Sequence, residues 1–493
     1  MPPIAAVCMS AAPEAGALLD ALAGCPLVGA RAALLPPAVA APRSELEPIH
    51  CARPDSSQAV AAVLRWFETS DADHLLWAAS PWPDPVPGAL KRLWTAALDS
   101  AAALAYGDRI EADGDGRLRQ HPLIDYQPGS LRDDFDFGPL LLMHRAALAG
   151  LSTALAEREP PLEHAGAYEL RLRLSERGPV LHLPEPLCTL PTADARPSGQ
   201  RVFDYVDPRD RQRQLELERV ATEHLARIGA HLPPPAEPPA PEHQPAPCTA
   251  SVVIPVKDRS RTIAEAVDSA LAQRADFSFN VIAVDNHSSD GTTDILATRA
   301  EGDPRLLHLV PARRDLGIGG CWNAAVFHPA CGRYAVQLDS DDLYAGENTL
   351  ARLVAEFQRA PAAMVIGAYT TVDFDLQPLP PGLVDHREWT PDNGHNNALR
   401  IHGLGAPRAF HTASLRRIGF PNVSYGEDYA VALQLSRRHR IGRIYEPLYR
   451  CRRWPGNSDA DLELAVHNRY QSYKDRLRSI EIAARQRLVA ARG

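Results

Sequence analysis

The sequence lacks the features that would place the chain in a membrane or secretory class. Nowhere does it reach about 18 consecutive apolar residues, the length that a membrane-spanning helix needs. The first residues, MPPIAAVCMSAAPEAG, have neither a basic segment nor a long apolar run, so a signal peptide is not expected. None of the eight cysteines has CxxC spacing, which argues against a zinc ribbon or a redox motif. Reduced thiols and a cytoplasmic location are the resulting expectation.

An excess of positive charge is also missing, because the net charge is −9 over 493 residues. A protein that coats nucleic acid would be basic, so this class is excluded. At about 150 residues per domain, the length indicates two or three domains. The arginines nevertheless cluster, since residues 400–458 contain eleven arginines, no lysine and three acids. Such a cluster fits a solvated face or a phosphate-binding pocket.

A proline-rich stretch divides the chain. Residues 233–247, PPPAEPPAPEHQPAP, cannot continue a helix or a sheet and indicate an extended linker, preceded by a charged helix over 207–228. After the linker, SVVIPV, NVIAVD, RLLHLV and YAVQLD alternate with helical stretches at 262–273, from 292 onward and at 318–327. This alternation predicts an α/β domain with a mainly parallel sheet, whose ligands bind beyond the carboxyl ends of the strands.

The strongest chemical signal is QLDSDDLY, where an expected strand runs into Asp339, Asp341 and Asp342. Three carboxylates within four residues repel one another and need a cation or full solvation. Oxygen ligands of this kind suit Mg²⁺ or Mn²⁺, which could neutralise a diphosphate leaving group. An Asp-rich turn that caps the next helix is the alternative explanation.

Three further motifs carry polar side chains at the expected ends of elements. AVDNHSSDGTTD places Asp285 and Asn286 at a strand end, where they could hold a ribose or a base edge. The alternative is a strand-to-helix turn in which Asp290 and Thr292 are caps. YGEDYAVAL opens a helix with Glu427 and Asp428, which either cap it or provide a general base. YRCRRWPGNSD holds arginines suited to phosphate oxygens or to a basic surface loop.

Taken together and in this order, the motifs resemble those of a family-two glycosyltransferase with the A-type glycosyltransferase fold, a Rossmann-like fold of nucleotide-diphospho-sugar transferases. The matching pieces lie within residues 250–460 and are SVVIPVKDR, AVDNHSSDGTTD, RRDLGIGGCWNAAV, YAVQLDSDDLY and the late GED followed by RCRRWPGNSD. The aspartate cluster together with the late GED is the most specific part. The resemblance implies a metal-dependent enzyme that moves a sugar from a nucleotide-diphosphate sugar to an acceptor hydroxyl.

The resemblance also implies roles for individual residues on the donor side. Asp285 and Asn286 match the acidic pair that contacts the donor nucleoside, with an amide where many relatives have a second Asp. Asp339 and Asp341 match the paired metal-binding aspartates, with Asp341 as the direct ligand and Asp339 also contacting sugar or ribose. The set expected to bind the donor is Pro255, Lys257, Asp285, Asn286, Asp339, Arg452 and Arg453.

The late motifs correspond to the catalytic and closing parts of such enzymes. Asp428 matches the catalytic base of inverting members, and Glu427 is expected beside it. Arg452 and Arg453 match a mobile segment that closes over the diphosphate. Many relatives carry a metal-binding His near Trp454, so here the ion would be held largely by the aspartates and the donor diphosphate. The expected cofactor is therefore Mn²⁺ or Mg²⁺.

The stretch DNGHNNALRIHGLGAPRAF, residues 392–410, lies where acceptors bind in this fold. It is rich in Asn, His, Arg and Gly and poor in apolar anchors, so a hydrophilic, carbohydrate-like acceptor is expected rather than a lipid tail. An ordinary long loop is the alternative. The residues expected to contact the acceptor are Asn396, Asn397, Arg400, His402 and Trp454.

The N-terminal half resembles the C-terminal half at an offset of 261 residues, without a gap between 167–187 and 428–448. Identities in this window are more frequent than the about one or two that chance would give, which indicates an internal duplication. The identical residues are Tyr168, Leu172, Leu174, Ser175, Arg177, Glu185, Pro186 and Leu187. The same offset places Gly166 and Ala167 opposite Glu427 and Asp428. It also places residues 78–81, AASP, opposite the aspartate cluster, so the first domain should keep the fold and lack the chemistry.

The expected organisation is therefore two tandem A-type domains, the first of them degenerate, joined by a helix and linker. The boundaries are 1–195 for the degenerate domain, 196–248 for the helix and linker, 249–460 for the catalytic domain and 461–493 for a C-terminal helix. The first domain could bind acceptor, form a homo-oligomer or brace the second.

Two other functions stay open. One is a sugar nucleotidyltransferase, although SVVIPVKDRSRT lacks the glycines of a phosphate loop. The other is a non-catalytic nucleotide-sugar-binding or scaffold protein. No nucleic-acid partner and no membrane span are expected.

Overall fold

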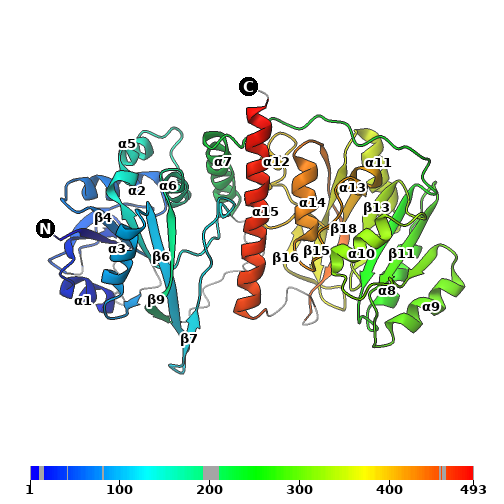
Figure 1. The fold of residues 1–493 in the computed structure, drawn as a ribbon, viewed down its shortest axis with the longest axis horizontal. Coiled ribbons are helices and arrows are strands. Elements are labelled where there is room, and N and C mark those ends of the chain that lie inside the picture. Colours follow the sequence, from blue (N-terminus) through cyan, green and yellow to red (C-terminus); the bar gives the residue numbers. More distant parts are fainter. Residues whose placement is uncertain are drawn as a thin grey trace. The chain divides into compact units, whose positions relative to one another are not determined.

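The computed structural model describes residues 2–9, 16–41, 43–79, 83–191, 210–454, 457 and 462–491. The chain divides into two compact units, each built on its own sheet (Figure 1). Considering described residues only, the first unit is drawn from Met1–Gly199, Arg211–His231 and Leu464–Ile482. The second is drawn from Gln200–Asp210, Leu232–Glu463 and Ala483–Gly493.

The sheet of the second unit has nine strands in the order β12-β11-β10-β13-β17-β15-β18-β14, with β16 beside β15. Strands β12, β11, β10 and β13 are parallel, and β17 is antiparallel to both of its neighbours. The strands are β10 (Ala250–Val256), β11 (Phe279–Asp285), β12 (Leu306–Leu309), β13 (Tyr334–Gln337), β14 (Leu343–Tyr344), β15 (Met364–Val372), β16 (Pro378–Val384), β17 (Arg408–His411) and β18 (Ile441–Arg452).

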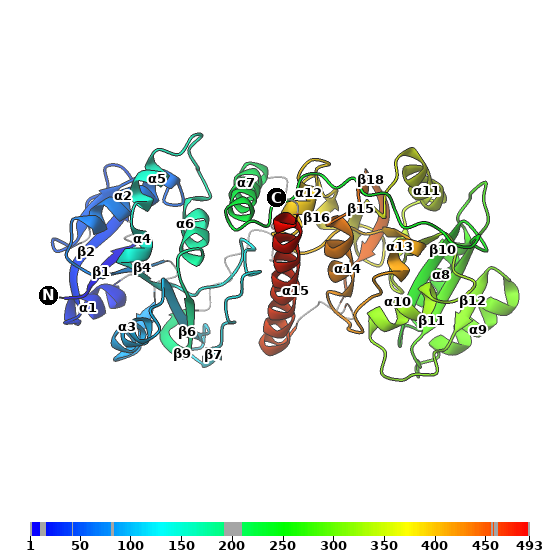
Figure 2. The ribbon, with the colours of Figure 1, turned by 45° about the horizontal axis from the view of Figure 1, so that its top comes forward.

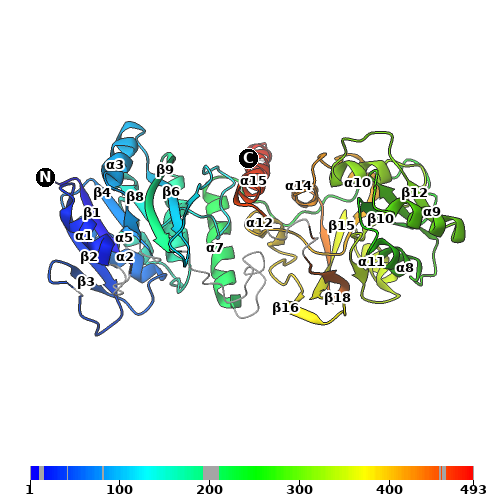
Figure 3. The ribbon, with the colours of Figure 1, turned by 90° about the horizontal axis from the view of Figure 1, so that it is seen from below.

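Helices cover both faces of this sheet, with α10 and α14 on one side and α8 and α11 on the other (Figure 3). The strands are therefore buried on both faces, which explains their continuous runs of β-branched residues. The helices are α8 (Ile263–Leu271), α9 (Thr292–Gly302), α10 (Ile318–Val326), α11 (Thr349–Arg359), α12 (Gly394–Asn397), α13 (Thr412–Arg416) and α14 (Glu427–Ser436). The α/β alternation predicted from the sequence is confirmed.

The first unit repeats this architecture. Its sheet has the order β3-β2-β1-β4-β8-β6-β9-β5, with β7 beside β6, which is the same order strand for strand. The strands are β1 (Ile4–Cys8), β2 (Val28–Leu35), β3 (Glu47–His50), β4 (His74–Ala78), β5 (Asp84–Pro85), β6 (Leu104–Ala112), β7 (Leu118–His121), β8 (Leu140–His144) and β9 (Val180–Pro191). The predicted duplication of the fold is confirmed.

Two hydrophobic clusters lie on opposite faces of this first sheet. Helices α2, α5 and α6 cover one face, and α1 and α3 cover the other (Figure 2). The helices are α1 (Gly16–Gly24), α2 (Ser57–Glu68), α3 (Ala89–Asp99), α4 (Arg145–Leu148), α5 (Leu151–Ala156), α6 (Gly166–Ser175) and α7 (Arg211–Arg227).

Strand pairing tests the alignment between the two halves position by position. Helix α6 begins at Gly166 and α14 at Glu427, so the offset of 261 holds there. At β4 the offset is 260 instead, because His74 pairs with His144 as Tyr334 pairs with His411. The correspondence expected for residues 78–81 is thus wrong by one position. The chemical conclusion does not change, because residues 78–83, AASPWP, contain no carboxylate; residues 80–82 lie outside the described part.

The segments between and after the sheets divide differently from the expected boundaries. Helix α7 belongs to the first unit, whereas the proline-rich stretch 233–247 belongs to the second. That stretch docks there through its backbone, since the amide of Glu237 donates to the carbonyl of Arg438. The start of the expected linker, residues 196–209, lies outside the described residues.

The C-terminal helix α15 (Leu464–Ala490) contributes residues to each unit. Within the first unit, its buried Asp475 accepts hydrogen bonds from Ser130 and from Arg132. Within the second unit, its buried Arg485 donates to the carbonyl of His395 and to the side chain of Asn396. Among the helices of the described residues, none is long and apolar enough to cross a bilayer.

A close approach between α10 and the loop before α14 gives the first testable prediction. A Cβ atom on Gly319 would lie 1.9 Å from the carbonyl oxygen of Pro421. Gly319→Ala is therefore expected to lower the free energy of unfolding by about 1–3 kcal/mol, measured by urea denaturation. Gly302→Ala is the matched control, because no atom lies within 4 Å of its added Cβ. Equal stability of the two variants would contradict the close packing.

Candidate active site

The carboxyl ends of β10, β11 and β13 bring together the predicted donor residues. These strands are parallel and adjacent, so their ends meet at one edge of the sheet. Pro255 lies within β10, and exposed Lys257 follows it. Asp285 ends β11, and Asp339 follows β13 by two residues.

Asp285 and Asn286 differ in how much of their hydrogen-bonding capacity is used. Asp285 is fully buried and accepts hydrogen bonds from the Ser288 amide at 2.9 Å and the Thr293 hydroxyl at 2.6 Å. Burial alone would raise the pKa of Asp285, but these hydrogen bonds outweigh it and lower that pKa. Asn286 donates to the carbonyl of Leu316, while its buried Oδ1 has no hydrogen-bond partner within the described structure. That oxygen is the polar atom left for a ligand.

In the aspartate cluster Asp341 and Asp342 are buried and Asp339 is partly buried, and the three carboxylates have different partners. Both oxygens of Asp339 accept from Nε2 of the Gln337 amide, at 3.0 and 2.9 Å. Asp342 accepts from the backbone amide of Arg452 at 2.7 Å. Burial, and then repulsion from neighbouring carboxylates, raises the pKa of Asp342 well above its ordinary value, and burial likewise raises that of Asp339. The cluster is thus electrostatically unfavourable without a cation.

Asp341 faces the late arginine-rich segment. Its Oδ2 accepts from the indole Nε1 of Trp454 at 3.0 Å and from the amide of Asn457 at 3.2 Å. The guanidinium of Arg259 lies 3.9 Å from the same oxygen. Trp454, which was expected on the acceptor side, thus contacts Asp341, the expected metal ligand.

The fit of this cluster to a divalent ion rests on charge rather than on a complete ligand set. Nowhere in the described chain do three or more His, Cys, Asp or Glu side chains gather around one point suited to a metal. Asp341 and Asp339 can supply oxygen ligands, and a cation would relieve the repulsion that raises the pKa of Asp339. The remaining ligands would have to come from water or from a bound diphosphate.

The predicted closing arginines are held by neighbours in the second unit. Buried Arg452 forms an ion pair with Glu265 of α8, and its guanidinium lies 5.2 Å from the centre of the Phe374 ring. Arg261 lies over the same ring at 4.1 Å. Arg453 is half-buried, and its backbone amide donates to Val372. Of the late motif quoted above, Pro455, Gly456, Ser458 and Asp459 lie outside the described residues.

Glu427 and Asp428 open α14 after Gly426, which has a φ of 77°. Asp428 is partly exposed, with 24% of its side chain accessible, and its Oδ2 forms an ion pair with Arg408 at 2.5 Å. Glu427 is buried, and its Oε2 has no hydrogen-bond partner among the described groups. Burial, and then the Asp428 carboxylate, raises the pKa of Glu427 to about 8. Of the two carboxyl groups, the partly exposed Asp428 is the one that an acceptor hydroxyl could reach.

The raised pKa of Glu427 makes stability depend on pH. Between its ordinary pKa of 4.5 and about 8, the native state holds a proton that the unfolded chain has released, so stability falls as pH rises. Glu427→Gln cannot ionise and is expected to gain about 2–4 kcal/mol over the wild type between about pH 5 and pH 8. Urea denaturation at both pH values measures this gain. The control is Glu301→Gln, an exposed carboxylate, and an equal gain at both pH values for Glu427→Gln would refute the buried proton.

The predicted acceptor residues are mostly structural. Asn396, Asn397 and Arg400 are at most 1% exposed, and their side chains bond inside the protein. Asn396 bonds the backbone of Leu232, and Asn397 donates to the carbonyl of Glu388. These three therefore do not present groups to an acceptor in this structure, which corrects that expectation. His402 is half-buried and stays a prediction.

Sequence reasoning missed Gln337 and Arg408. The amide oxygen of Gln337 accepts from the Arg408 backbone at 3.2 Å and from its Nη1 at 2.8 Å. Arg408 in turn contacts Asp428, while Gln337 contacts Asp339. Gln337 opens the quoted motif QLDSDDLY but was read only as part of the strand, and Arg408 is one of eleven arginines in its region. Their role follows from the pairing of β13 with β17.

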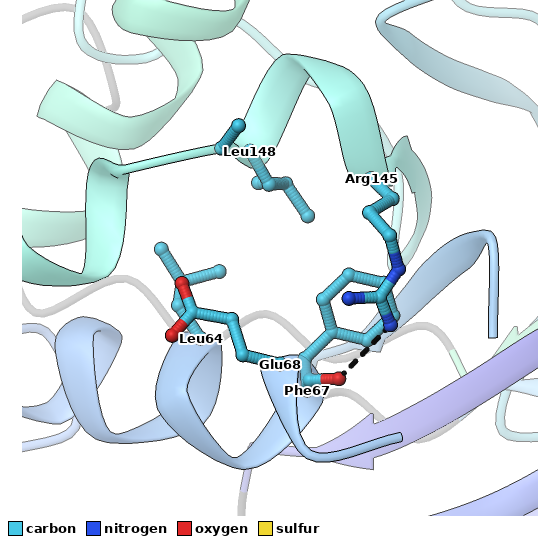
Figure 4. A pocket seen from close by; sticks show the side chains of 6 residues that line it. Leu64, Phe67, Glu68, Arg145 and Leu148 are labelled. Carbon is cyan, nitrogen blue, oxygen red and sulfur yellow. Dashed lines mark hydrogen bonds between the residues drawn. The ribbon is translucent and has the colours of Figure 1, made fainter. Parts of the chain in front are cut away.

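A separate pocket in the first unit is lined by Leu64, Phe67, Glu68, Arg145, Leu148 and Ala149 (Figure 4). The Arg145 guanidinium lies 4.3 Å from the centre of the Phe67 ring and donates to the Phe67 carbonyl at 3.2 Å. Arg145 also bonds the carbonyls of Ala72 and Ser70. The pocket contains none of the predicted site residues, and its arginine serves the local fold.

Three solved structures are similar to part of the chain. TarS 1–349 from S. aureus, in complex with UDP-GlcNAc, is 21% identical with a TM-score of 0.37, over 46% of this chain and 70% of that chain. The mannosyltransferase PcManGT from Pyrobaculum calidifontis, in complex with GDP-Man and Mn²⁺, is 21% identical with a TM-score of 0.33, over 56% and 83%. Glucosyl-3-phosphoglycerate synthase from Mycobacterium tuberculosis is 19% identical with a TM-score of 0.34, over 47% and 80%.

The family match is more direct than these structural similarities. No curated protein matches the chain. Residues 251–420, however, match the model described as glycosyl transferase family 2. The matched range contains β10, β11 and the aspartate cluster, and α14 with Asp428 follows it in the same unit. The part of this chain that is similar to family 2 glycosyltransferases therefore lies within the second unit.

Proposed function

We propose that the second unit transfers a sugar from a nucleoside-diphosphate sugar to a hydroxyl of a hydrophilic, carbohydrate-like acceptor, with inversion at the anomeric carbon. The family match supports the reaction class. The observation that carries the assignment of roles is the placement of Asp428, an accessible carboxylate, in the same hydrogen-bonded group as Asp339. A base and a donor-side carboxylate thus share one site.

On the donor side, the proposal uses residues at the strand ends. Asn286 offers its unpaired Oδ1 to the nucleoside, beside Asp285. Pro255 and Lys257 border the same edge of the sheet, while Arg452 and Arg453 face the diphosphate from the end of β18. Mn²⁺ or Mg²⁺, held by Asp341 and Asp339 together with the diphosphate, would supply neutralisation of the leaving-group charge.

The chemical step proposed is a single displacement. Asp428 accepts the proton of the acceptor hydroxyl, and that oxygen forms a bond to the anomeric carbon. The bond from this carbon to the diphosphate oxygen breaks, and its electron pair leaves with the nucleoside diphosphate. The contribution of Asp428 is general base catalysis, and the fixed arginines and carboxylates supply positioning and electrostatic stabilisation.

The first unit is proposed to be non-catalytic. Gly166 and Ala167 open α6 at the positions where α14 has Glu427 and Asp428, and neither can take up a proton. Residues 78–83 offer no carboxylate for a cation. The proposed roles of this non-catalytic unit remain binding the acceptor, forming a homo-oligomer or bracing the second unit.

The experiment that tests the proposed function is a donor panel. The purified chain is incubated with UDP-, GDP- and dTDP-sugars and with Mn²⁺ or Mg²⁺, and release of the nucleoside diphosphate is followed. Metal-dependent release from one donor supports the transferase and names its donor. If no donor is cleaved and calorimetry with UDP, GDP and dTDP shows no binding, the proposal is wrong. Release of pyrophosphate from a nucleoside triphosphate and a sugar phosphate would instead indicate a nucleotidyltransferase.

A further inference from the structure

A continuous hydrogen-bonded path joins the two sides of the proposed active site. Asp428 Oδ2 pairs with Arg408 Nη2 at 2.5 Å, and Arg408 Nη1 donates to Gln337 Oε1 at 2.8 Å. Gln337 Nε2 then donates to both oxygens of Asp339, at 3.0 and 2.9 Å. The path runs from a helix, α14, through two neighbouring strands of the sheet.

The chemistry of the two central side chains fixes the direction of this path. Arginine can only donate, and a carboxylate that is ionised can only accept. The amide of Gln337 must therefore present its oxygen to Arg408 and its nitrogen to Asp339. In the opposite orientation the Gln337 oxygen would face the Asp339 carboxylate and its NH2 would face the Arg408 guanidinium, so Arg408 favours the orientation in which Gln337 donates to Asp339.

Arg408 is itself held in a single place. Its Nε donates to the carbonyl of Leu404 at 2.7 Å, and its backbone amide donates to Gln337 Oε1 at 3.2 Å. Burial lowers the pKa of Arg408, but the carboxylates of Asp428, Asp339 and Glu427 outweigh this effect and raise it. A cation that faces three carboxylates and is fixed at both ends of its side chain can set the orientation of the most accessible of them.

We propose that Arg408 is a positioning residue that orients the Asp428 carboxylate toward the acceptor and, through Gln337, holds Asp339 in the same frame. The inference rests on the proposed function, because it assigns Asp428 as the base. Arg408 itself transfers no proton and forms no bond to the sugar. Its contribution is to fix the orientation and position of the Asp428 and Asp339 carboxylates, which belong to different elements.

The alternative is that the Arg408–Asp428 ion pair only stabilises the fold. A series of variants distinguishes this structural role from the proposed positioning role. The variants are Arg408→Ala, Arg408→Lys, Gln337→Met, Asp428→Asn and the double variant Arg408→Ala/Asp428→Asn. The matched control is Arg299→Ala, which removes an arginine that pairs with Asp268 at 2.9 Å in the same unit. Release of nucleoside diphosphate from the donor that the wild type uses is the activity, and thermal unfolding monitors the fold.

Arg408→Ala is expected to lower kcat by about 100-fold and Gln337→Met by about tenfold, while the affinity for free nucleoside diphosphate changes by less than about threefold. Guanidinium chloride at millimolar concentration is expected to restore part of the activity of Arg408→Ala and none of that of Asp428→Asn. The double variant should be no slower than Asp428→Asn by more than about threefold, because residues that act as a unit are not additive.

Several results would overturn the inference. They are turnover by Arg408→Ala equal to that of Arg299→Ala, multiplicative losses in the double variant, or no rescue by guanidinium in a folded Arg408→Ala. If Arg408→Ala does not fold, Gln337→Met and Arg408→Lys provide the same test. Both variants are expected to have a lower kcat than the wild type, and an unchanged kcat would contradict the inference. Failure of the wild type with every donor is distinguishable, since it removes the proposed function itself and this inference with it.

Discussion

Asp428→Asn is expected to lower the rate of sugar transfer by about a thousandfold, within the range that general base catalysis contributes. The change keeps the size of the side chain, and the amide oxygen can still accept from Arg408, whose Nη2 lies 2.5 Å from Asp428 Oδ2. What is lost is the capacity to take the acceptor proton. The measurement is kcat for nucleoside diphosphate release, together with the affinity for free nucleotide, which should stay unchanged.

The control for this prediction is Asp294→Asn. Asp294 is likewise an aspartate in the first turn of a helix, α9, but it is exposed and was assigned no role at the site. Its substitution tests whether any loss comes from the helix terminus rather than from the base. Wild-type rates for Asp428→Asn would show that another group accepts the proton.

Asp341→Ala is expected to lower metal-dependent turnover by about two to three orders of magnitude, since Lewis-acid stabilisation of a leaving group is worth several kcal/mol. Asp341 is the carboxylate of the cluster that faces Trp454 and Asn457 on the side of the late arginines. Removing it leaves a cation with fewer protein oxygens. Turnover is measured as a function of Mn²⁺ concentration, and Mn²⁺ binding by electron paramagnetic resonance.

The same titration is run on Asp303→Ala, which removes an aspartate paired with Arg305 at 2.7 Å in the same unit. That variant should follow the wild-type Mn²⁺ curve. Asp341→Ala is expected to need far more Mn²⁺ and to reach a lower plateau. If Asp341→Ala has the wild-type Mn²⁺ curve and plateau, either the metal binds elsewhere or turnover does not need a metal.

The fold could be predicted well because its signals are local. Strands buried on both faces leave continuous apolar runs such as SVVIPV and NVIAVD, and helices between them leave caps and periodic apolar positions. The duplication was visible because α6 and α14, with the strands that follow them, keep their length and several identical residues. The single offset was wrong by one position at β4, because the net one-residue difference between the halves lies between β6 and α6, outside the stretch in which the identical residues occur.

The candidate site was predicted in part, and its failures have two physical causes. The aspartates at the ends of β11 and β13 are placed by sequence neighbours, so their position followed from the pattern. Gln337 and Arg408 become partners only because β17 pairs with β13, and no local pattern encodes that pairing. The opposite error occurred at Asn396 and Asn397, where polarity was taken for exposure. Their amides instead satisfy buried backbone groups, as buried polar side chains must.

Arg485 has a consequence for where this gene can be cut. The last turns of α15 complete the second unit, because the guanidinium of Arg485 bonds the carbonyl of His395 and the amide oxygen of Asn396. A fragment that stops after the sheet, near residue 460, would contain every strand of the second unit. It would lack Arg485, so the His395 carbonyl and the Asn396 amide oxygen would lose the guanidinium that donates to them. Because α15 supplies residues to both units, dividing the gene at a single point between the two copies of the fold would not give two complete units.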